Sequence, residues 1–237
     1  MDRVFLSAEW RHLAMINYAI DPAVLAPLVP PGTELDFFHG TTYASLVGFQ
    51  FLKTRVLGIS FPFHRNFEEV NLRFYVRARS PAGWRRGVVF VRELVPRRAI
   101  AFIARVVYGE PYTALPMRHT IEETPPRFRV RYEWRRRGQW ELLEVAGSGE
   151  AEEIAAGSSA EFITEHYWGF TNRRSKSTEY EVAHPRWRAR EVTQSKVEAD
   201  IASLYGERFV ESLSAPPASA FLAAGSEVIV RPHTISR

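Results

Sequence analysis

One short stretch carries a row of polar side chains that could do chemistry. In "FHRNFEEVNLRFYV", residues 63–76, the two-residue period of a strand places Phe67, Glu69, Asn71, Arg73 and Tyr75 on one face. An acid, an amide, a guanidinium and a phenol in one row could bind and polarise a small polar compound if this face looks into a cavity. A solvated outer face with structural ion pairs would show the same row, so the residues alone leave both interpretations open.

Two histidines are further candidates for the same cavity. In "TEHYWGF", residues 164–170, His166 either lines a pocket or packs at a helix end, and the second interpretation is the simpler one. In "PMRHT", residues 116–120, Met117 and His119 share one strand face and Arg118 has the other. Only one of Arg118 and His119 can therefore point inward, and the sequence does not say which.

The residue types exclude several other kinds of site. The chain has 237 residues and no cysteine, so it has no disulfide, thiolate nucleophile or cysteine-bound metal. Its seven histidines show no metal-type spacing, and the usual nucleotide, hydrolase and zinc-protease signatures do not occur. We expect neither a metal nor a cofactor.

The charge of +4 comes almost entirely from arginine, because Lys53, Lys176 and Lys196 are the only lysines among 31 basic residues. Arginines interleave with Trp134 and Trp140 in a manner that nucleic-acid platforms also use, but charged edge strands look the same and the charge is not segregated. We expect no nucleic-acid partner. Because no apolar leader or membrane span is apparent, we expect no membrane partner and a cytoplasmic location.

The hydrophobic pattern predicts the frame that must position these side chains. Strands are expected over 9–20, 63–76, 85–96, 176–187, 188–200 and 226–233, with two more within 34–56, an extended segment over 113–123 and a hairpin over 127–145. Helices are expected over 22–28, capped by Asp21, over 97–109, over 159–170, capped by Ser159, and over 201–213, with loops over 148–159 and 215–225. This order predicts one α+β domain over 1–237, mainly antiparallel β, with its sheet curled into a barrel.

Three stretches, "NFEEVNLRFYV", "RRGVVFVRELVPRRAIAFIARVVYGEPYTALPM" and "EHYWGF", resemble a bacterial family of uncharacterised YqjF-like proteins. The hallmark F-x-E-x-N-x-R-x-Y-V of that family is matched from Phe67 to Val76, and the resemblance runs over nearly the whole chain. The family is similar in fold to acetoacetate decarboxylase, a cone-shaped antiparallel barrel that holds its ligand in the lumen. The resemblance implies that Glu69 and Arg73 point inward.

The same resemblance shows that the catalytic amine is missing. The decarboxylase has "YGFPKK", where the first lysine forms a Schiff base, and the matching run here is "YGEPYT", residues 108–113, so Tyr112 and Thr113 replace the lysines. A phenol cannot form an imine, and no other lysine falls near this run. Decarboxylation through a Schiff base is therefore not expected.

Two classes of function remain. In the first, the chain is an enzyme for a small carbonyl or carboxylate compound, in which Glu69 is the general acid or base of a lysine-independent lyase or isomerase and Arg73 anchors the anionic end. Hydrogen bonds would come from Asn71, Tyr75, Tyr112 and His119. In the second, it is a non-catalytic ligand-binding or sensing module, and Glu69 and Arg73 could then neutralise each other as a structural pair. The resemblance also makes a homo-oligomer plausible.

Overall fold

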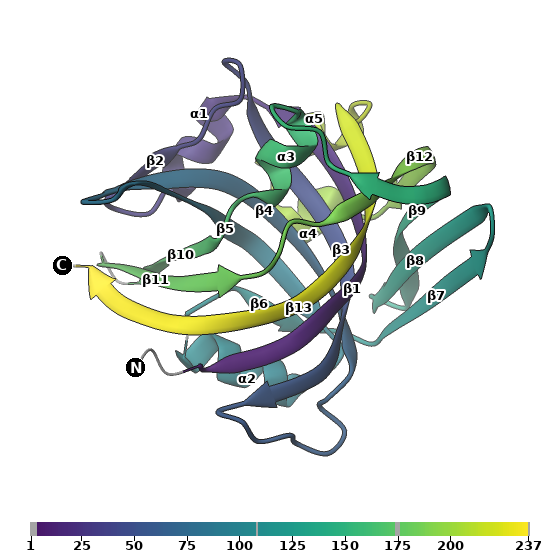
Figure 1. Ribbon diagram of the computed structural model, residues 1–237, viewed down its shortest axis with the longest axis horizontal. Coiled ribbons are helices and arrows are strands. Elements are labelled where there is room, and N and C mark those ends of the chain that lie inside the picture. Colours follow the sequence, from purple (N-terminus) through teal and green to yellow (C-terminus); the bar gives the residue numbers. More distant parts are fainter. Residues whose placement is uncertain (1–3, 108, 174–175, 237) are drawn as a thin grey trace.

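A mixed sheet of 13 strands makes up most of the fold, with short helices beside it (Figure 1). The computed structural model describes residues 4–107, 109–173 and 176–236, and only the backbone of residues 107, 173, 176 and 233–236. Tyr108 and the side chain of Lys176, both named above, lie outside this description. The strands are β1 (Leu6–Ile20), β2 (Thr33–Leu35), β3 (Thr42–Val56), β4 (Phe67–Ser80), β5 (Gly83–Val95), β6 (Tyr112–Ala114), β7 (Met117–Thr124), β8 (Arg127–Arg136), β9 (Gln139–Glu153), β10 (Trp168–Arg173), β11 (Lys176–Ala183), β12 (Arg188–Glu198) and β13 (Ser219–Ser236).

The pairing order closes seven of the strands into a ring. Strand β1 pairs with both β3 and β13, so the path β1-β3-β4-β5-β10-β11-β13 returns to the strand where it began. Strands β12, β9, β8 and β7 continue from β13 as a separate arm. Among the described pairs, β5 is parallel to β10 and β6, and the others are antiparallel. The predicted α+β class with a mainly antiparallel sheet is confirmed in this coarse form.

Strand β4, which carries the polar row, is buried on both faces. Val70, Leu72 and Phe74 belong to a large apolar cluster that includes residues of β1, β3, β8 and β9. The opposite face contributes Phe67 and Tyr75 to a second apolar cluster, formed with residues of β1, β3, β5 and β13. Since apolar residues cover both sides of this strand, the polar row cannot be a solvated outer face.

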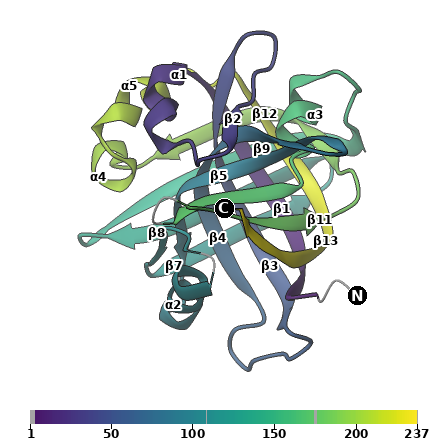
Figure 2. The same cartoon turned by 90° about the vertical axis from the view of Figure 1, so that its left-hand side faces the viewer.

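The helices are short and occupy the two ends of the molecule. They are α1 (Pro22–Leu25), η1 (Ala26–Leu28), α2 (Arg98–Val107), α3 (Ser159–Thr164), α4 (Ile201–Tyr205), η2 (Glu207–Phe209) and α5 (Val210–Ser214). In Figures 1 and 2, α2 lies at the same end as the loop between β3 and β4, whereas α1, α3 and α5 lie at the opposite end. The cap predicted at Asp21 is confirmed, because its carboxylate accepts a hydrogen bond from the Ala23 amide. The cap of α3 is Ser158 and not Ser159.

Four predictions about local structure were wrong. The strand expected in the first part of 34–56 is reduced to β2, which pairs with β4 rather than with β3. The helix expected over 159–170 ends at Thr164 and is followed by β10, and the first part of the loop expected over 148–159 belongs to β9. The loop expected over 215–225 lies mostly within β13, whose small residues permit close strand contact: a Cβ at Gly225 would overlap the Trp10 carbonyl. The alanine and glycine residues therefore suggested a loop, although their small size allows β13 to pack closely against β1.

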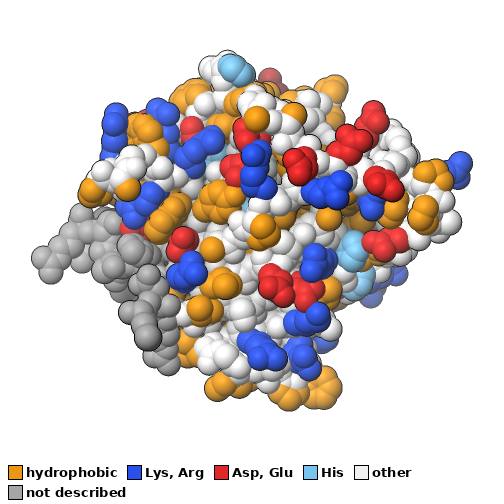
Figure 3. Space-filling model, viewed as in Figure 1, with side chains coloured by type: hydrophobic (Ala, Val, Ile, Leu, Met, Phe, Trp, Pro, Cys, Tyr) orange, Lys and Arg blue, Asp and Glu red, His pale blue; other side chains and the backbone are white. Residues whose placement is uncertain are grey.

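The charged surface is mixed in sign. On the face in Figure 3, acidic and basic side chains are interspersed. In the hairpin of β8 and β9, Arg136 pairs with Glu141 at 2.8 Å and with Asp200 at 3.0 Å, and Trp134 is buried.

Within the described ranges, no helix is long and apolar enough to cross a membrane.

Candidate functional site

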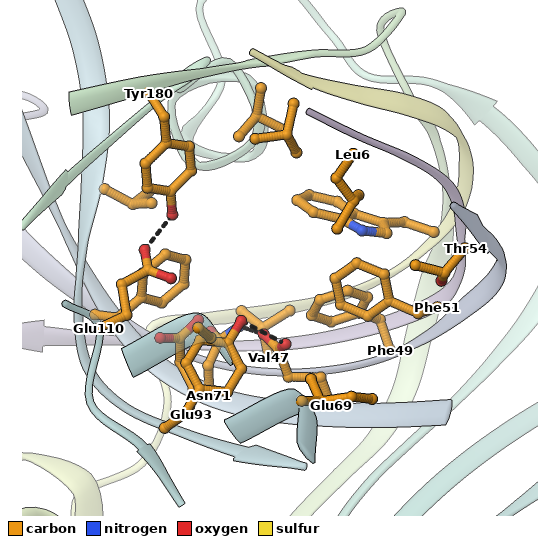
Figure 4. A pocket seen from close by; sticks show the side chains of 18 of the residues that line it. Leu6, Val47, Phe49, Phe51, Thr54, Glu69, Asn71, Glu93, Glu110 and Tyr180 are labelled. Atoms are coloured by element: carbon orange, nitrogen blue, oxygen red, sulfur yellow. Dashed lines mark hydrogen bonds between the residues drawn. The ribbon is translucent and has the colours of Figure 1, made fainter. Parts of the chain in front are cut away.

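A cavity of about 340 Å³ lies inside the ring of strands. Its walls come from β1, β3, β4, β5, β6, β10, β11 and β13, with Ile100, Ile103 and Ala104 of α2 at one end. In Figure 4, Glu110 and Tyr180 face Phe49 and Phe51 across the hollow. Aromatic and aliphatic side chains form much of the wall, and Asn71, Glu93 and Glu110 lie near one another on one side of it (Figure 4).

The strand register brings three polar residues of the wall into one row. Asn71 in β4 lies opposite Glu93 in β5, and Glu93 lies opposite Tyr112 in β6. Glu69 and Arg73 lie two residues to either side of Asn71, and all of these residues line the cavity. Neighbouring strands are about 5 Å apart, so polar groups from three strands meet in one patch.

The end of α2 positions Glu110 in the same wall. Gly109 has a φ of 74°, in the left-handed region that commonly ends a helix, and Pro111 cannot continue a helix. Because the residue before a proline is driven toward extended conformations, the chain turns sharply into β6 at Glu110. The Glu110 carboxylate accepts a hydrogen bond from the hydroxyl of Tyr180 in β11.

Glu69 is the candidate acid or base. Its side chain is buried, with one carboxylate oxygen accepting from Asn71 Nδ2 at 2.9 Å and the other from the Tyr112 hydroxyl at 3.0 Å. Burial raises the pKa of Glu69 to about 7, although both hydrogen bonds and the more distant Arg73 oppose this rise. A carboxyl with a pKa near neutrality can both release and accept a proton at physiological pH.

Two more buried carboxyls lie beside Glu69. Burial raises the pKa of Glu110 to about 8, against the effect of the hydrogen bond from Tyr180. Burial, together with the nearby charges of Glu110 and Glu69, raises the pKa of Glu93 well above its ordinary value. Like charges in one buried patch cannot all ionise at little cost, so the three carboxyls titrate as a coupled group.

Arg73 remains available to a ligand. It is 8% exposed, its Nε atom is buried without a hydrogen-bond partner, and within the described chain its guanidinium makes no ion pair within 4.0 Å. The structural pair between Glu69 and Arg73 is therefore not formed. The guanidinium lies over the Tyr75 ring, 5.8 Å from its centroid, but it has no anionic partner, and a buried guanidinium without one is costly because its lost hydration is not replaced.

His166 lines the cavity as well, and its environment fixes its protonation. Its Nε2 atom lies 3.1 Å from a carboxylate oxygen of Asp36, which also accepts from Arg86 Nε at 2.6 Å. Burial lowers the pKa of His166 to about 4, so the ring is neutral at pH 7. Asp36 can only accept here, so Nε2 carries the proton and Nδ1, buried without a partner, is a free acceptor.

The structure brings together four of the six residues chosen from sequence. Glu69, Asn71, Arg73 and Tyr112 line the cavity. Tyr75 is not among the lining residues; its hydroxyl lies 2.6 Å from Ser45 Oγ, and its ring packs against His166 with centroids 4.7 Å apart.

The pair that the sequence left open, Arg118 and His119, does not line the cavity either. Arg118 pairs with Glu133 at 2.8 Å, and His119 Nδ1 lies 3.5 Å from a carboxylate oxygen of Glu68, on the other face of β4. We therefore leave His119 and Tyr75 out of the candidate site.

Sequence reasoning missed Glu93, Glu110 and Tyr180, and it favoured a packing role for His166. Glu110 could have been found, because it lies two residues before Tyr112 in the run that was compared with "YGFPKK". No local pattern indicates Tyr180, which joins the site through the pairing of β11 with β10 and β13.

Solved structures with the same fold include several acetoacetate decarboxylase-like proteins. The acetoacetate decarboxylase of Legionella pneumophila matches with a TM-score of 0.65 and 12% identity, over 98% of this chain and 87% of that one. An acetoacetate decarboxylase-like enzyme from Sphingomonas wittichii RW1 matches with a TM-score of 0.65 and 14% identity, over 100% and 94%. The enduracididine biosynthesis enzyme MppR, solved with pyruvate, matches with a TM-score of 0.64 and 12% identity, over 100% and 90%. The protein thus has an acetoacetate decarboxylase-like fold.

Sequence comparison identifies the family. Residues 7–227 match the DUF2071 family, described as "Uncharacterized conserved protein (COG2071)", and the chain belongs to that family. It is 26% identical over 186 residues to the uncharacterized protein YqjF of Bacillus subtilis (strain 168), covering 75% of this chain and 72% of the relative. The predicted resemblance to YqjF-like proteins is confirmed.

Proposed function

We propose that the ring of strands forms a cone-shaped barrel whose cavity binds a small carbonyl or carboxylate compound, and that Glu69 transfers a proton to or from this compound. One observation carries the proposal: a buried carboxyl with a pKa of about 7 shares a cavity wall with an unpaired guanidinium. Groups of this kind, held in a cavity and shifted by a stated cause, are typical of functional sites.

The proposed chemistry is proton transfer beside a carbonyl group. Arg73 would hold the carboxylate or the carbonyl oxygen of the ligand with charge-assisted hydrogen bonds. The ionised Glu69 would remove a proton from the adjacent carbon, leaving an enolate and a neutral Glu69, which returns the proton to another atom. Asn71 and Tyr112, which donate to Glu69 before the reaction, would keep its carboxylate in position. Such a step belongs to a lyase, an isomerase or a hydratase.

A Schiff base is not part of the proposal. No lysine is among the residues that line the cavity, all of which lie in the described chain. Lys53 and Lys196, the two lysines whose side chains are described, pair with Glu9 and Glu198 at the surface. The solved structures that share the fold include MppR with pyruvate and with a condensation product of pyruvate and imidazole 4-carboxaldehyde, which supports a 2-oxo acid as the first compound to test.

The test is the exchange of the pyruvate methyl protons in D₂O, followed by proton NMR, for the wild type and for Glu69→Gln. We expect the variant to lose about 100-fold or more of the exchange rate, because general acid–base catalysis is worth about 10²–10⁴-fold. Pyruvate affinity, measured by calorimetry, should change little in Glu69→Gln and fall in Arg73→Gln. The control is Glu144→Gln, since Glu144 is equally buried but lies outside the cavity.

The non-catalytic alternative predicts a different pattern. If the chain is a binding module, no compound of a small 2-oxo acid library will exchange, and Glu69→Gln will change affinity or stability instead. Exchange that is unaffected by Glu69→Gln would overturn the role of this residue. Failure of every small carboxylate to bind in an Arg73-dependent way would overturn both functions.

A further inference from the structure

The carboxyl groups of the cavity differ from the other buried carboxyls of the chain in lacking a cation. Six buried acids each have an arginine or histidine nitrogen within 4.0 Å: Asp36, Glu68, Glu133, Glu141, Glu144 and Glu179. Within the described chain, Glu69, Glu93 and Glu110 have none, and all three line the same cavity. Within the described residues, the buried acids thus have an arginine or histidine partner except where they line this cavity.

Unpartnered acceptors in the same wall provide an independent observation. Asn71, 1% exposed, donates its amide to Glu69, but its Oδ1 atom is buried with no hydrogen-bond partner. Glu93 Oε2 and His166 Nδ1 are also buried without a partner. An orphaned acceptor is costly in a folded protein and is commonly satisfied by a ligand or water. A ligand group that donates several hydrogen bonds would satisfy Asn71 Oδ1, His166 Nδ1 and the ionised form of Glu93 together.

We infer that the compound bound in the cavity carries an ammonium or guanidinium group, which binds among Glu93, Glu110 and Asn71, in addition to the anionic or carbonyl end that Arg73 holds. This inference rests on the proposed function, because it adds a second recognition element to the same cavity. A cation at this position supplies the positive charge that would balance the carboxylates. It also supplies hydrogen-bond donors for the unpartnered acceptors. The volume of about 340 Å³ leaves room for a compound with two separate polar ends.

Proton release is the signature of this kind of binding. In the empty cavity at pH 7, Glu93 and Glu110 hold their protons, since burial and the repulsion of neighbouring carboxylates raise their pKa values. When a cation binds, a neutral carboxyl becomes a carboxylate and its proton leaves to the solvent, so that the charge of the new ion pair balances. A purely anionic compound would instead keep the acids neutral or cause proton uptake. The charged and titratable groups that face the patch are Glu69, Glu93, Glu110, Tyr112, Tyr180, Arg73 and His166.

The experiment compares 4-guanidinobutanoate with heptanoate, two carboxylates of similar length of which only the first carries a cation. Binding is measured by calorimetry at pH 7 in buffers of different ionisation enthalpy, which gives the number of protons released. We expect 4-guanidinobutanoate to bind about tenfold or more tightly than heptanoate and to release protons, because hydrogen bonds to charged groups are worth about 1.5–3 kcal/mol. Heptanoate should release none.

Variants separate this inference from the proposed function. Glu93→Gln and Glu110→Gln should each lower the ratio of 4-guanidinobutanoate affinity to heptanoate affinity and reduce the proton release, whereas Arg73→Gln should weaken the binding of both compounds. The control Glu144→Gln should bind like the wild type. If heptanoate binds in an Arg73-dependent way but 4-guanidinobutanoate binds no more tightly or takes up protons, the inference is wrong and the anion site stands. If neither compound binds, the inference is overturned, and the pyruvate measurements decide the proposed function separately.

Discussion

Replacing Glu110 by glutamine should make the protein more stable, and increasingly so as the pH rises. The unfolded chain releases the proton of this carboxyl near the ordinary pKa of 4.5, whereas the folded protein retains it up to a pKa of about 8. Between these values the folded state binds more protons than the unfolded state, so the free energy of unfolding falls as the pH rises. At about 1.4 kcal/mol for each pH unit, the loss by pH 8 is about 5 kcal/mol.

Glu110→Gln removes this titration but keeps an oxygen that can accept from Tyr180. The variant and the wild type should therefore have similar stability at pH 4.5, and the variant should exceed the wild type by up to about 5 kcal/mol at pH 8. Because Glu69 and Glu93 interact with Glu110, the measured difference describes the coupled group. The assay is urea unfolding at half-unit steps from pH 4.5 to pH 9, followed by circular dichroism.

Glu144→Gln is the control with the opposite sign. Arg129 and Arg131 hold the pKa of Glu144 below its ordinary value, so this carboxylate stabilises the fold above its unfolded pKa and stops doing so as the pH falls. The control variant should be less stable than the wild type by a constant amount from pH 5.5 to pH 8. If Glu110→Gln shows the same constant difference, the carboxyl is ionised in the folded protein and the reasoning about the cavity acids is refuted.

Two further predictions concern the walls of the cavity. Gly87→Ala should lower the free energy of unfolding, measured with urea, by about 2 kcal/mol or more. The reason is that a Cβ at this position would overlap the Trp168 carbonyl across the β5–β10 pair. An unchanged urea midpoint would show that the two strands can move apart at no cost. The ring of His166 should remain neutral at every pH above about 5 in a nitrogen NMR titration, because its pKa is about 4. Titration near pH 6.5 would show that the ring is hydrated rather than buried.

The sequence was sufficient to find the polar row of β4 because the strand has no irregularity there. A period of two places Glu69, Asn71 and Arg73 on one face, and the structure keeps all three in the cavity wall. Whether that face points inward or outward depends on what covers the other face of β4. Residues of β8 and β9, far along the chain, cover it. Periodicity describes which residues share a face, and only tertiary packing decides what that face meets.

Glu93 could not be found in this way because of a bulge in β5. Strict alternation places Phe90 and Arg92 on the same face, and Glu93 on the other. The pairing with β4 shifts register between Leu72 and Arg73, which leaves one extra residue in β5, so Phe90 and Glu93 both face the cavity. A bulge reverses the inward face of every later residue, and nothing in the local sequence marks its position.

The acids around Tyr112 are incompatible with a nucleophilic amine at that position. An amine can form a Schiff base when burial and a cationic neighbour lower its pKa, as the resemblance to acetoacetate decarboxylase implies for that enzyme. At Tyr112, the neighbours are Glu69, Glu93 and Glu110, whose charges raise the pKa of a nearby acid and would equally hold an amine in its protonated form. A lysine at this position would be a non-nucleophilic ammonium. A phenol, which donates a hydrogen bond without titrating near neutral pH, is compatible with three acids, so the residues around Tyr112 favour proton transfer by carboxyl groups over covalent catalysis by an amine.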